Sequence, residues 1–133
     1  MKMREILFHG KRADNGEWVE GDLLQTRYHS GHIEYQIMPQ TPVSSAYPVL
    51  SETVGQYTGL TDRNGVRIFE GDIVHCVSKL DSADMVVIFE CGQFRMILVE
   101  KYHEYQTNVG YYDINCFAKE VIGNIHDNPE LME

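Results

Sequence analysis

Short apolar or alternating runs dominate the hydrophobic pattern of this chain, and no window of a dozen residues shows a helical period. The segment HIEYQIM alternates cleanly, with Ile33, Tyr35 and Ile37 on one side. Three further runs are short and rich in β-branched and aromatic residues, namely REILF (4–8), MVVIFE (85–90) and FRMILVE (94–100). Because such runs are typical of β-strands, the pattern predicts an all-β protein.

Turns and loops are predicted where small or polar residues separate these runs. HSG at 29–31 and CGQ at 91–93 each lie between two predicted strands and favour tight hairpins. Loops are predicted at 39–49, which holds three of the four prolines, and at 101–112. One short helical turn is predicted at the C-terminus, with Asn128 as its cap and Pro129 in its first position.

One phrase occurs twice, as DNGEWVEGDLL at 14–24 and as RNGVRIFEGDIV at 63–74. Its Asn-Gly pair favours a two-residue hairpin turn in which both positions have positive φ. Glu-Gly-Asp then predicts a bend, because glycine relieves its steric cost and aspartate bonds a nearby backbone N–H. A second echo, ETVGQY and EVIGNI, puts a glycine inside a closing strand. The residues with these predicted turn and bend roles are Gly16, Gly21, Asp22, Gly55, Gly65, Gly71, Asp72 and Gly123.

The repetition predicts two small β lobes that begin with the same order of turn, strand, bend and strand. The first lobe is expected at residues 1–52 and the second, an SH3-like barrel with an inserted hairpin at 85–99, at residues 53–133; one compact unit is the alternative. Duplication predicts equivalent bends at Gly21 and Gly71, and equivalent faces for Trp18 and Ile68. The interpretation that competes with duplication is chance recurrence of common turn motifs.

Three blocks of the sequence resemble the YopX family of bacteriophages and prophages of Gram-positive bacteria. They are REILFHGKRADNGEWVEGDL, ETVGQYTGLTDRNGVRIFEGDIV and EVIGNIHDNPEL, which occur in the family's order between Arg4 and Leu131. The resemblance implies a small, mostly-β, cytoplasmic protein made in a phage-carrying host. It implies no assigned activity and no catalytic residues. The intervening stretches SSAYPVLS and EKYHEYQTNVGYY match no pattern of the family.

Composition and charge narrow the class of protein. The 133 residues are 43% hydrophobic, and neither a membrane-spanning run nor a signal peptide is expected. Three separated cysteines without a Cys-x-x-Cys pair predict free thiols in a reducing compartment. The net charge of −9 repels nucleic-acid phosphates, although Lys2, Arg4, Lys11 and Arg12 supply four of the eleven basic residues.

No recognisable catalytic constellation occurs, so neither enzyme activity nor a cofactor is expected. His29 and His32 lack further ligands at zinc-site spacing, and His75 and Cys76 point to opposite faces of a strand. The carboxylates beside Gly21 and Gly71 are explained by turn chemistry. Cys91 has no adjacent base, and no glycine-rich phosphate loop is present.

The aromatic residues are the candidate contacts with a partner, because tyrosine and tryptophan are enriched in binding surfaces. These candidates are Trp18, Tyr57, Tyr102, Tyr105, Tyr111 and Tyr112, and burial in the core is their alternative role. We expect a protein-interaction module that binds a host or phage protein and self-associates through a weakly charged strand edge such as FRMILV. The alternative is a nucleic-acid-binding β-barrel that uses the basic N-terminus.

Overall fold

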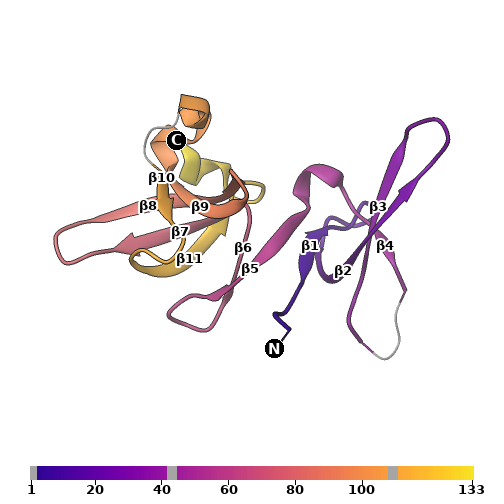
Figure 1. Ribbon diagram of the computed structural model, residues 1–133, viewed down its shortest axis with the longest axis horizontal. Coiled ribbons are helices and arrows are strands. Elements are labelled where there is room, and N and C mark those ends of the chain that lie inside the picture. Colours follow the sequence, from indigo (N-terminus) through magenta and orange to yellow (C-terminus); the bar gives the residue numbers. More distant parts are fainter. Residues whose placement is uncertain (1–2, 42–44, 108–110) are drawn as a thin grey trace. The chain divides into compact units, whose positions relative to one another are not determined.

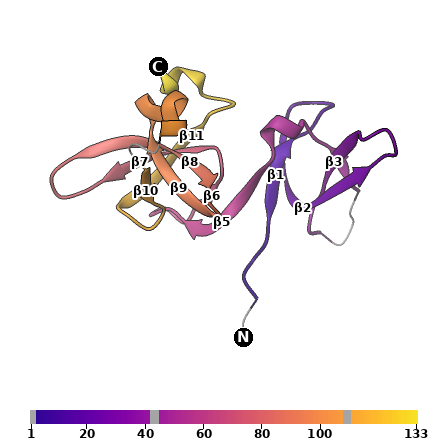
Figure 2. The same ribbon diagram turned by 45° about the horizontal axis from the view of Figure 1, so that its top comes forward.

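The computed structural model describes residues 3–41, 45–107 and 111–133 and has a mostly-β fold (Figures 1 and 2). This confirms the expected fold class. The chain divides into two compact units, residues 1–59 and 60–133. The division falls inside strand β5 (Gly55–Thr61), whereas the expected boundary precedes that strand at residue 52.

The first unit is an antiparallel arrangement around β1. Its elements are β1 (Phe8–Lys11), β2 (Trp18–Arg27), β3 (Ile33–Met38), β4 (Tyr47–Pro48), the 3-10 helix η1 (Ser51–Thr53) and β5. The strand order is β4-β3-β2-β1-β5-β6, in which β5 runs on into the second unit. Among the described residues of the first unit, the buried apolar side chains are Leu7, Ile37, Val49 and Tyr57.

The second unit is a five-stranded antiparallel sheet with the order β10-β9-β8-β7-β11. Its elements are β6 (Arg67–Phe69), β7 (Asp72–Val77), β8 (Ser82–Glu90), β9 (Gln93–Leu98), η2 (Val99–Thr107), β10 (Tyr111–Asp113), β11 (Ala118–Asn124) and η3 (Pro129–Met132). Within the described part of the chain no pairing joins β10 to β11, so the SH3-like barrel stays a prediction.

Each face of this second sheet carries its own core, because alternate residues of a strand point to opposite faces. One cluster includes Val74, Met85 and Met96, and the other includes Ile73 and Ile97. Side chains of η2 and η3 pack on the second cluster, and both views show the two helices side by side (Figures 1 and 2). Both faces of the central strands are therefore buried.

The hairpins differ in detail from the two-residue turns expected at Asn-Gly. Only the glycine of each pair has positive φ, +74° at Gly16 and +80° at Gly65. Gly65 N donates to Asp62 O over 3.0 Å and Asp62 N donates to Val66 O over 2.8 Å, which closes a three-residue loop. The two-residue turn is instead found at Cys91-Gly92, where both φ angles are positive.

The prediction of equivalent bends at Gly21 and Gly71 is wrong. Gly71 has a φ of +93° in the turn between β6 and β7. Gly21 lies inside the continuous strand β2, opposite Phe8, and a Cβ there would overlap the Met38 carbonyl group. Gly21 therefore permits a close backbone approach and Gly71 permits a turn, so the same sequence motif has a different backbone geometry at each position.

Three local expectations also need correction. The predicted loop at 101–112 contains most of η2 and the start of β10. The predicted C-terminal turn is present as η3, with Asn128 at the N-cap position and Pro129 in its first turn, but the Asn128 side chain makes no capping hydrogen bond. Its Oδ1 atom accepts a hydrogen bond from Asn124 N over 3.1 Å instead. The FRMILV run is not an edge, because β9 lies between β8 and β10. An unpaired edge at FRMILV therefore does not support self-association, which stays a prediction.

Candidate functional site

Strand β8 runs past the end of its neighbour β9 at one end of the second sheet. The two-residue turn pairs Glu90 with Gln93, and the register then places Met85 opposite Leu98, the last residue of β9. Residues 82–84 of β8 consequently pair with β7 but extend beyond β9. The sheet is locally incomplete here, and two hollows adjoin this overhang.

The first hollow is a cavity of about 230 Å³ on the face of the Met85 cluster. Its lining is largely apolar and aromatic: Cys76, Ser78, Asp81, Ser82, Ala83, Met85, Leu98, Tyr112 and Phe117. Alternation along β8 explains why Ala83 and Met85 share this face. The cavity is suited to an apolar group of about the size of one large side chain.

Phe117 forms the outer wall of this cavity from a strained backbone conformation. Its φ is +68°, which is uncommon for a bulky residue, and 37% of its surface is exposed. The Phe117 ring meets the Tyr112 ring edge to face, with centroids 5.7 Å apart. Lys119 Nζ donates to the carbonyl oxygens of Cys116 and Phe117, each over 3.0 Å. These bonds hold an exposed aromatic ring at the cavity, where strain marks a candidate functional position.

The thiol of Cys76 contributes a neutral group to the cavity wall. Its Sγ atom lies 3.8 Å from Met96 Sδ, and only 2% of the residue is exposed. Burial raises the pKa of Cys76 to about 11. The thiol is therefore protonated at neutral pH and does not provide a nucleophile.

The second hollow is a groove of about 500 Å³, and it shares Asp81, Ser82, Ala83 and Leu98 with the cavity. The described residues that line it are Asp81, Ser82, Ala83, Asp84, Leu98, Val99, Glu100, Leu131 and Glu133. Four of these residues carry carboxylates and none is lysine or arginine. The groove is therefore acidic over an apolar floor, in contrast to the cavity.

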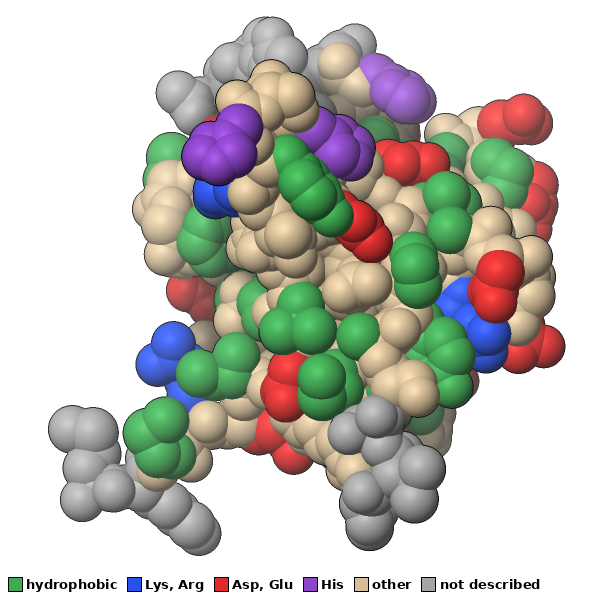
Figure 3. Space-filling view, turned by 90° about the vertical axis from the view of Figure 1, so that its right-hand side faces the viewer, with side chains coloured by type: hydrophobic (Ala, Val, Ile, Leu, Met, Phe, Trp, Pro, Cys, Tyr) green, Lys and Arg blue, Asp and Glu red, His purple; other side chains and the backbone are tan. Residues whose placement is uncertain are grey.

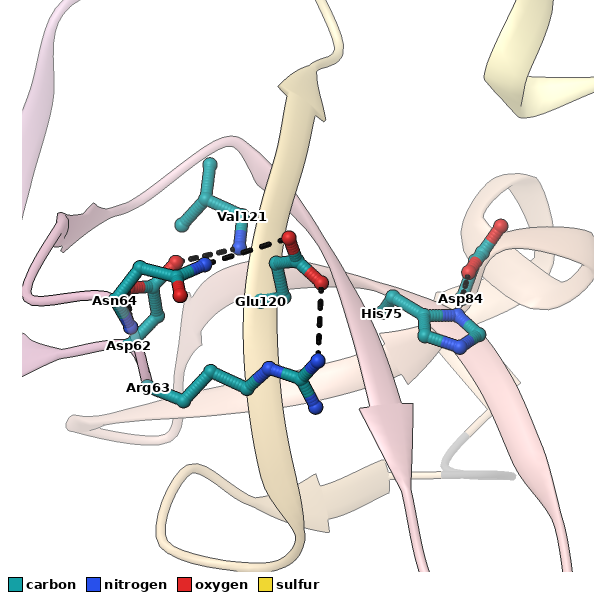
Figure 4. A network of polar contacts seen from close by, with 7 residues as sticks. All are labelled: Asp62, Arg63, Asn64, His75, Asp84, Glu120 and Val121. Atoms are coloured by element: carbon teal, nitrogen blue, oxygen red, sulfur yellow. Dashed lines mark hydrogen bonds and ion pairs between the residues drawn. The ribbon is translucent and has the colours of Figure 1, made fainter.

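Asp84 and His75 are hydrogen-bonded to each other beside this groove. His75 Nδ1 lies 2.7 Å from Asp84 Oδ1, and the two residues are direct partners on β7 and β8 (Figure 4). On its other side His75 is paired with Glu120 of β11. Cys76 lies in the core cluster of the opposite face, as strand alternation requires.

A second polar network ties the Asn64-Gly65 loop to the edge strand β11 (Figure 4). Asp62 is 8% exposed and accepts hydrogen bonds from the backbone N–H groups of Asn64, Val66 and Val121. Burial raises the pKa of Asp62, but the three backbone donors outweigh this effect and hold the pKa below its usual value. The network is structural, because its contacts close the loop and hold it on β11.

The aromatic residues named from the sequence have separate locations. Tyr112 lines the cavity, whereas Tyr102 and Tyr111 pack on the second core cluster. Tyr57 is only 8% exposed in the first unit. Trp18 lies 4.4 Å from His9 between ring centroids, and Lys11 Nζ lies 5.6 Å from the Trp18 centroid. The Tyr105 side chain falls outside the part that the structure describes.

Sequence reasoning missed Phe117 and the β8 overhang. The segment CFAKE at 116–120 does not predict a positive φ at Phe117, because that φ depends on the turn that precedes β11. The overhang depends on the relative lengths of β8 and β9. A signal was available in the Cys91-Gly92 turn, because a two-residue turn fixes the register of both strands.

The turn and bend residues are placed by several distinct contacts. Asp72 is 6% exposed, and its Oδ2 atom accepts a hydrogen bond from Phe69 N over 2.8 Å, which supports the Gly71 turn. Asp22 is exposed and accepts from Gln40 Nε2 over 2.7 Å. Gly55 begins β5, and Gly123 lies in β11 next to a shift in register after Val121. These residues shape the fold and do not line either hollow.

The basic residues near the N-terminus are partly engaged within the first unit. Arg12 Nη2 lies 2.7 Å from Asp14 Oδ2, and its guanidinium lies 4.1 Å from the centre of the Tyr47 ring. Lys2 falls outside the described residues, and Arg4 is exposed. The contacts of Arg12 and Lys11 reduce the basic surface on which a nucleic-acid interface would depend.

No group of three histidine, cysteine, aspartate or glutamate side chains converges on a common point within residues 3–41, 45–107 and 111–133. In the same ranges, no helix has the length and apolar character needed to cross a membrane. Figure 3 shows hydrophobic side chains in separate patches between polar groups on one face of the molecule. We take the two hollows beside β8 as the candidate site, because they adjoin each other and the open end of this strand.

Comparison with known proteins gives a family and a fold. The model of the YopX protein family matches residues 7–133 of this chain, which confirms the resemblance found in the sequence. Protein EF1440 from Enterococcus faecalis is 24% identical, with 98% of this chain and 100% of that chain covered and a TM-score of 0.57. Protein yopX from Bacillus subtilis is 18% identical, with 96% and 95% covered and a TM-score of 0.55. No curated protein matches this chain.

Proposed function

The chain belongs to the YopX family, and we propose that it is a protein-interaction module that binds a segment of a partner protein at the cavity beside β8. The partner is a host or phage protein, and the module acts as a phage or prophage accessory in the host cytoplasm. The exposed ring of Phe117, held at positive φ over an apolar cavity, is the observation that carries this proposal.

The size and chemistry of the cavity favour a side chain of a protein over a metabolite. Pockets for small molecules usually have volumes of roughly 300–1,000 Å³ and contain converging polar groups. This cavity has about 230 Å³, and methionine, leucine, alanine, cysteine and two aromatic side chains line most of it, with Ser78, Asp81 and Ser82 as its polar residues. Binding hot spots have the same character, with one large apolar group in a pocket that excludes water.

A substitution that removes the wall but not the fold gives the sharpest test. Phe117→Gly deletes the ring, while glycine adopts the φ of +68° at no steric cost. Peptides are first selected from a displayed random library on the unmodified protein. Their affinities are then measured for Phe117→Gly and for the control Phe89→Ala, which truncates another exposed phenylalanine outside both hollows.

We expect Phe117→Gly to weaken the selected peptides by about tenfold or more, and Phe89→Ala to leave their affinity unchanged. Thermal unfolding of each variant controls for loss of fold. The proposal fails if no peptide is enriched, or if both variants bind equally well. Enrichment of a peptide from this chain's own sequence would identify a second copy as the partner, and sedimentation of the free protein would check it.

A further inference from the structure

We propose that residues 82–84 of β8 bind the partner segment as an added β-strand, with an apolar side chain in the cavity and an adjacent Lys or Arg in the acidic groove. This inference rests on the proposed function and specifies how the segment is recognised. In this arrangement one bound segment contacts the cavity, the groove and the overhang at the same time.

The backbone of the overhang supports strand addition. Residues 82–84 pair with residues 75–77 of β7, and β9 ends opposite Met85. Among the described residues no strand occupies the other side of this stretch, although η2 begins at Val99 directly after β9 and contacts β8 beside Asp84. A strand with one open side offers N–H and C=O groups to an extended peptide, and such addition is a recurring mode of peptide recognition. Ser82 N already donates to Asp81 Oδ1 over 2.7 Å, so a bound segment would pair with the remaining backbone groups of this stretch.

Alternation along β8 then assigns one hollow to each face of the added strand. Ala83 lies opposite Cys76 on the cavity face, and Asp84 lies opposite His75 on the groove face. Successive side chains of a bound strand likewise point to opposite faces. A residue opposite Ala83 therefore enters the cavity, and the residue next to it enters the groove.

The charge of the groove selects a cation at that adjacent position. Asp81, Asp84, Glu100 and Glu133 come from the β7–β8 turn, β8, η2 and the segment after η3, so the carboxylates surround the position from several elements. A cation on the groove face near Asp84, whose Oδ1 atom also contacts His75 Nδ1, gains a favourable cross-strand interaction, whereas a carboxylate there is repelled. The stems of Lys and Arg also pack well on the apolar floor of Leu98, Val99 and Leu131.

Three matched hexapeptides separate this arrangement from simple attraction. TTFKTT places Phe and Lys on opposite faces of a strand, whereas TFTKTT has the same composition but places them on one face. TTFETT keeps the spacing and reverses the charge. Each peptide is titrated into the full-length protein while backbone amide shifts are followed by NMR.

We expect TTFKTT to shift the amides of residues 82–84 and Phe117 and to bind at least about tenfold more tightly than either control. N-methylation of its backbone should weaken binding at alternate positions, because only every second N–H of an added strand bonds β8. Glu100→Gln should weaken TTFKTT. Glu52→Gln makes the same change in charge on an exposed residue of η1 in the first unit, and it should leave the affinity for TTFKTT unchanged.

Strand addition is overturned if TFTKTT binds as well as TTFKTT, if N-methylation has no alternating effect, or if millimolar TTFKTT shifts no amide of β8. The cationic subsite is overturned if TTFETT binds equally well. In each of these cases, library peptides that still depend on Phe117 would leave the proposed function intact. Failure of the library selection itself would instead remove the proposed function.

Discussion

Asp62 Oδ2 accepts a hydrogen bond from Val121 N over 2.9 Å, and the two residues are 59 positions apart in the chain. The other carboxylate oxygen accepts from Asn64 N and Val66 N inside the loop. One side chain thus closes a hairpin and fastens it to β11. Arg63 N adds a bond to Lys119 O, so this loop covers part of the edge that β11 exposes.

Replacement of Asp62 should destabilise the protein more than replacement of an exposed aspartate. Asp62→Ala leaves three backbone N–H groups without their acceptor, and we expect a loss of at least about 2 kcal/mol in the free energy of unfolding. Urea denaturation measures this loss. Asp14→Ala, which removes an exposed carboxylate paired with Arg12, is the control and should change the midpoint little. Equal effects of the two variants would contradict the structural role of Asp62.

The contribution of Asp62 should depend on pH in a defined direction. Its pKa is lowered in the folded protein, because the backbone donors outweigh the effect of burial. The stabilisation is therefore complete above the unfolded pKa of about 3.9 and is lost as the pH falls through the lower, folded pKa. Comparison of the wild-type protein with Asp62→Asn between pH 6 and pH 2 should show a gap in stability that narrows below about pH 4. A gap that widens on acidification would refute this assignment.

Gly21→Ala should be more damaging than Gly16→Ala. A Cβ at Gly21 overlaps the backbone of Met38, so β2 and β3 have to separate locally. At Gly16 no atom lies within 4 Å of the added Cβ, and the φ of +74° alone is expected to cost about 1 kcal/mol. Denaturation midpoints of the two variants test this order. The reverse order would mean that β2 tolerates a side chain at its close approach to β3.

The three thiols should react at different rates. Cys91 is exposed in its turn, Cys116 is half-buried and Cys76 is buried, with its pKa raised to about 11 by burial. A thiol-specific reagent at pH 8 should modify Cys91 first and Cys76 last, because thiolate and access are both required. Mass spectrometry of quenched samples identifies the order, and Cys91→Ser should abolish the fastest phase. Early modification of Cys76 would show that the cavity opens in solution.

The sequence predicted the strands well because their signals are local. Ile33, Tyr35 and Ile37 alternate within one strand, and the Cys91-Gly92 turn alone fixes how β8 and β9 pair. The repeated motif gave a wrong prediction of equivalent bends because identical residues can adopt different backbone geometry. Gly71 provides a turn and Gly21 a close approach, and only the partner strand β3 distinguishes them.

Helix η2 and the candidate site show what local patterns omit. KYHEYQT has no helical period, and η2 packs its Tyr102 side chain on a cluster contributed by β7, β8 and β9. Of the cavity residues, the sequence singled out Tyr112 and Cys76 but not Phe117, whose conformation is held by hydrogen bonds from Lys119.

By itself, the sequence determined the all-β class, the family, and the hairpins whose glycines adopt positive φ, because these depend on neighbouring residues. Tertiary structure alone decided which strands became edges, where β9 ends along the register that the Cys91-Gly92 turn fixes, and how four carboxylates from distant segments line one groove. The physical reason is that burial and charge density depend on distances through space. Residues 81 and 133 share a groove although 52 positions separate them in the chain.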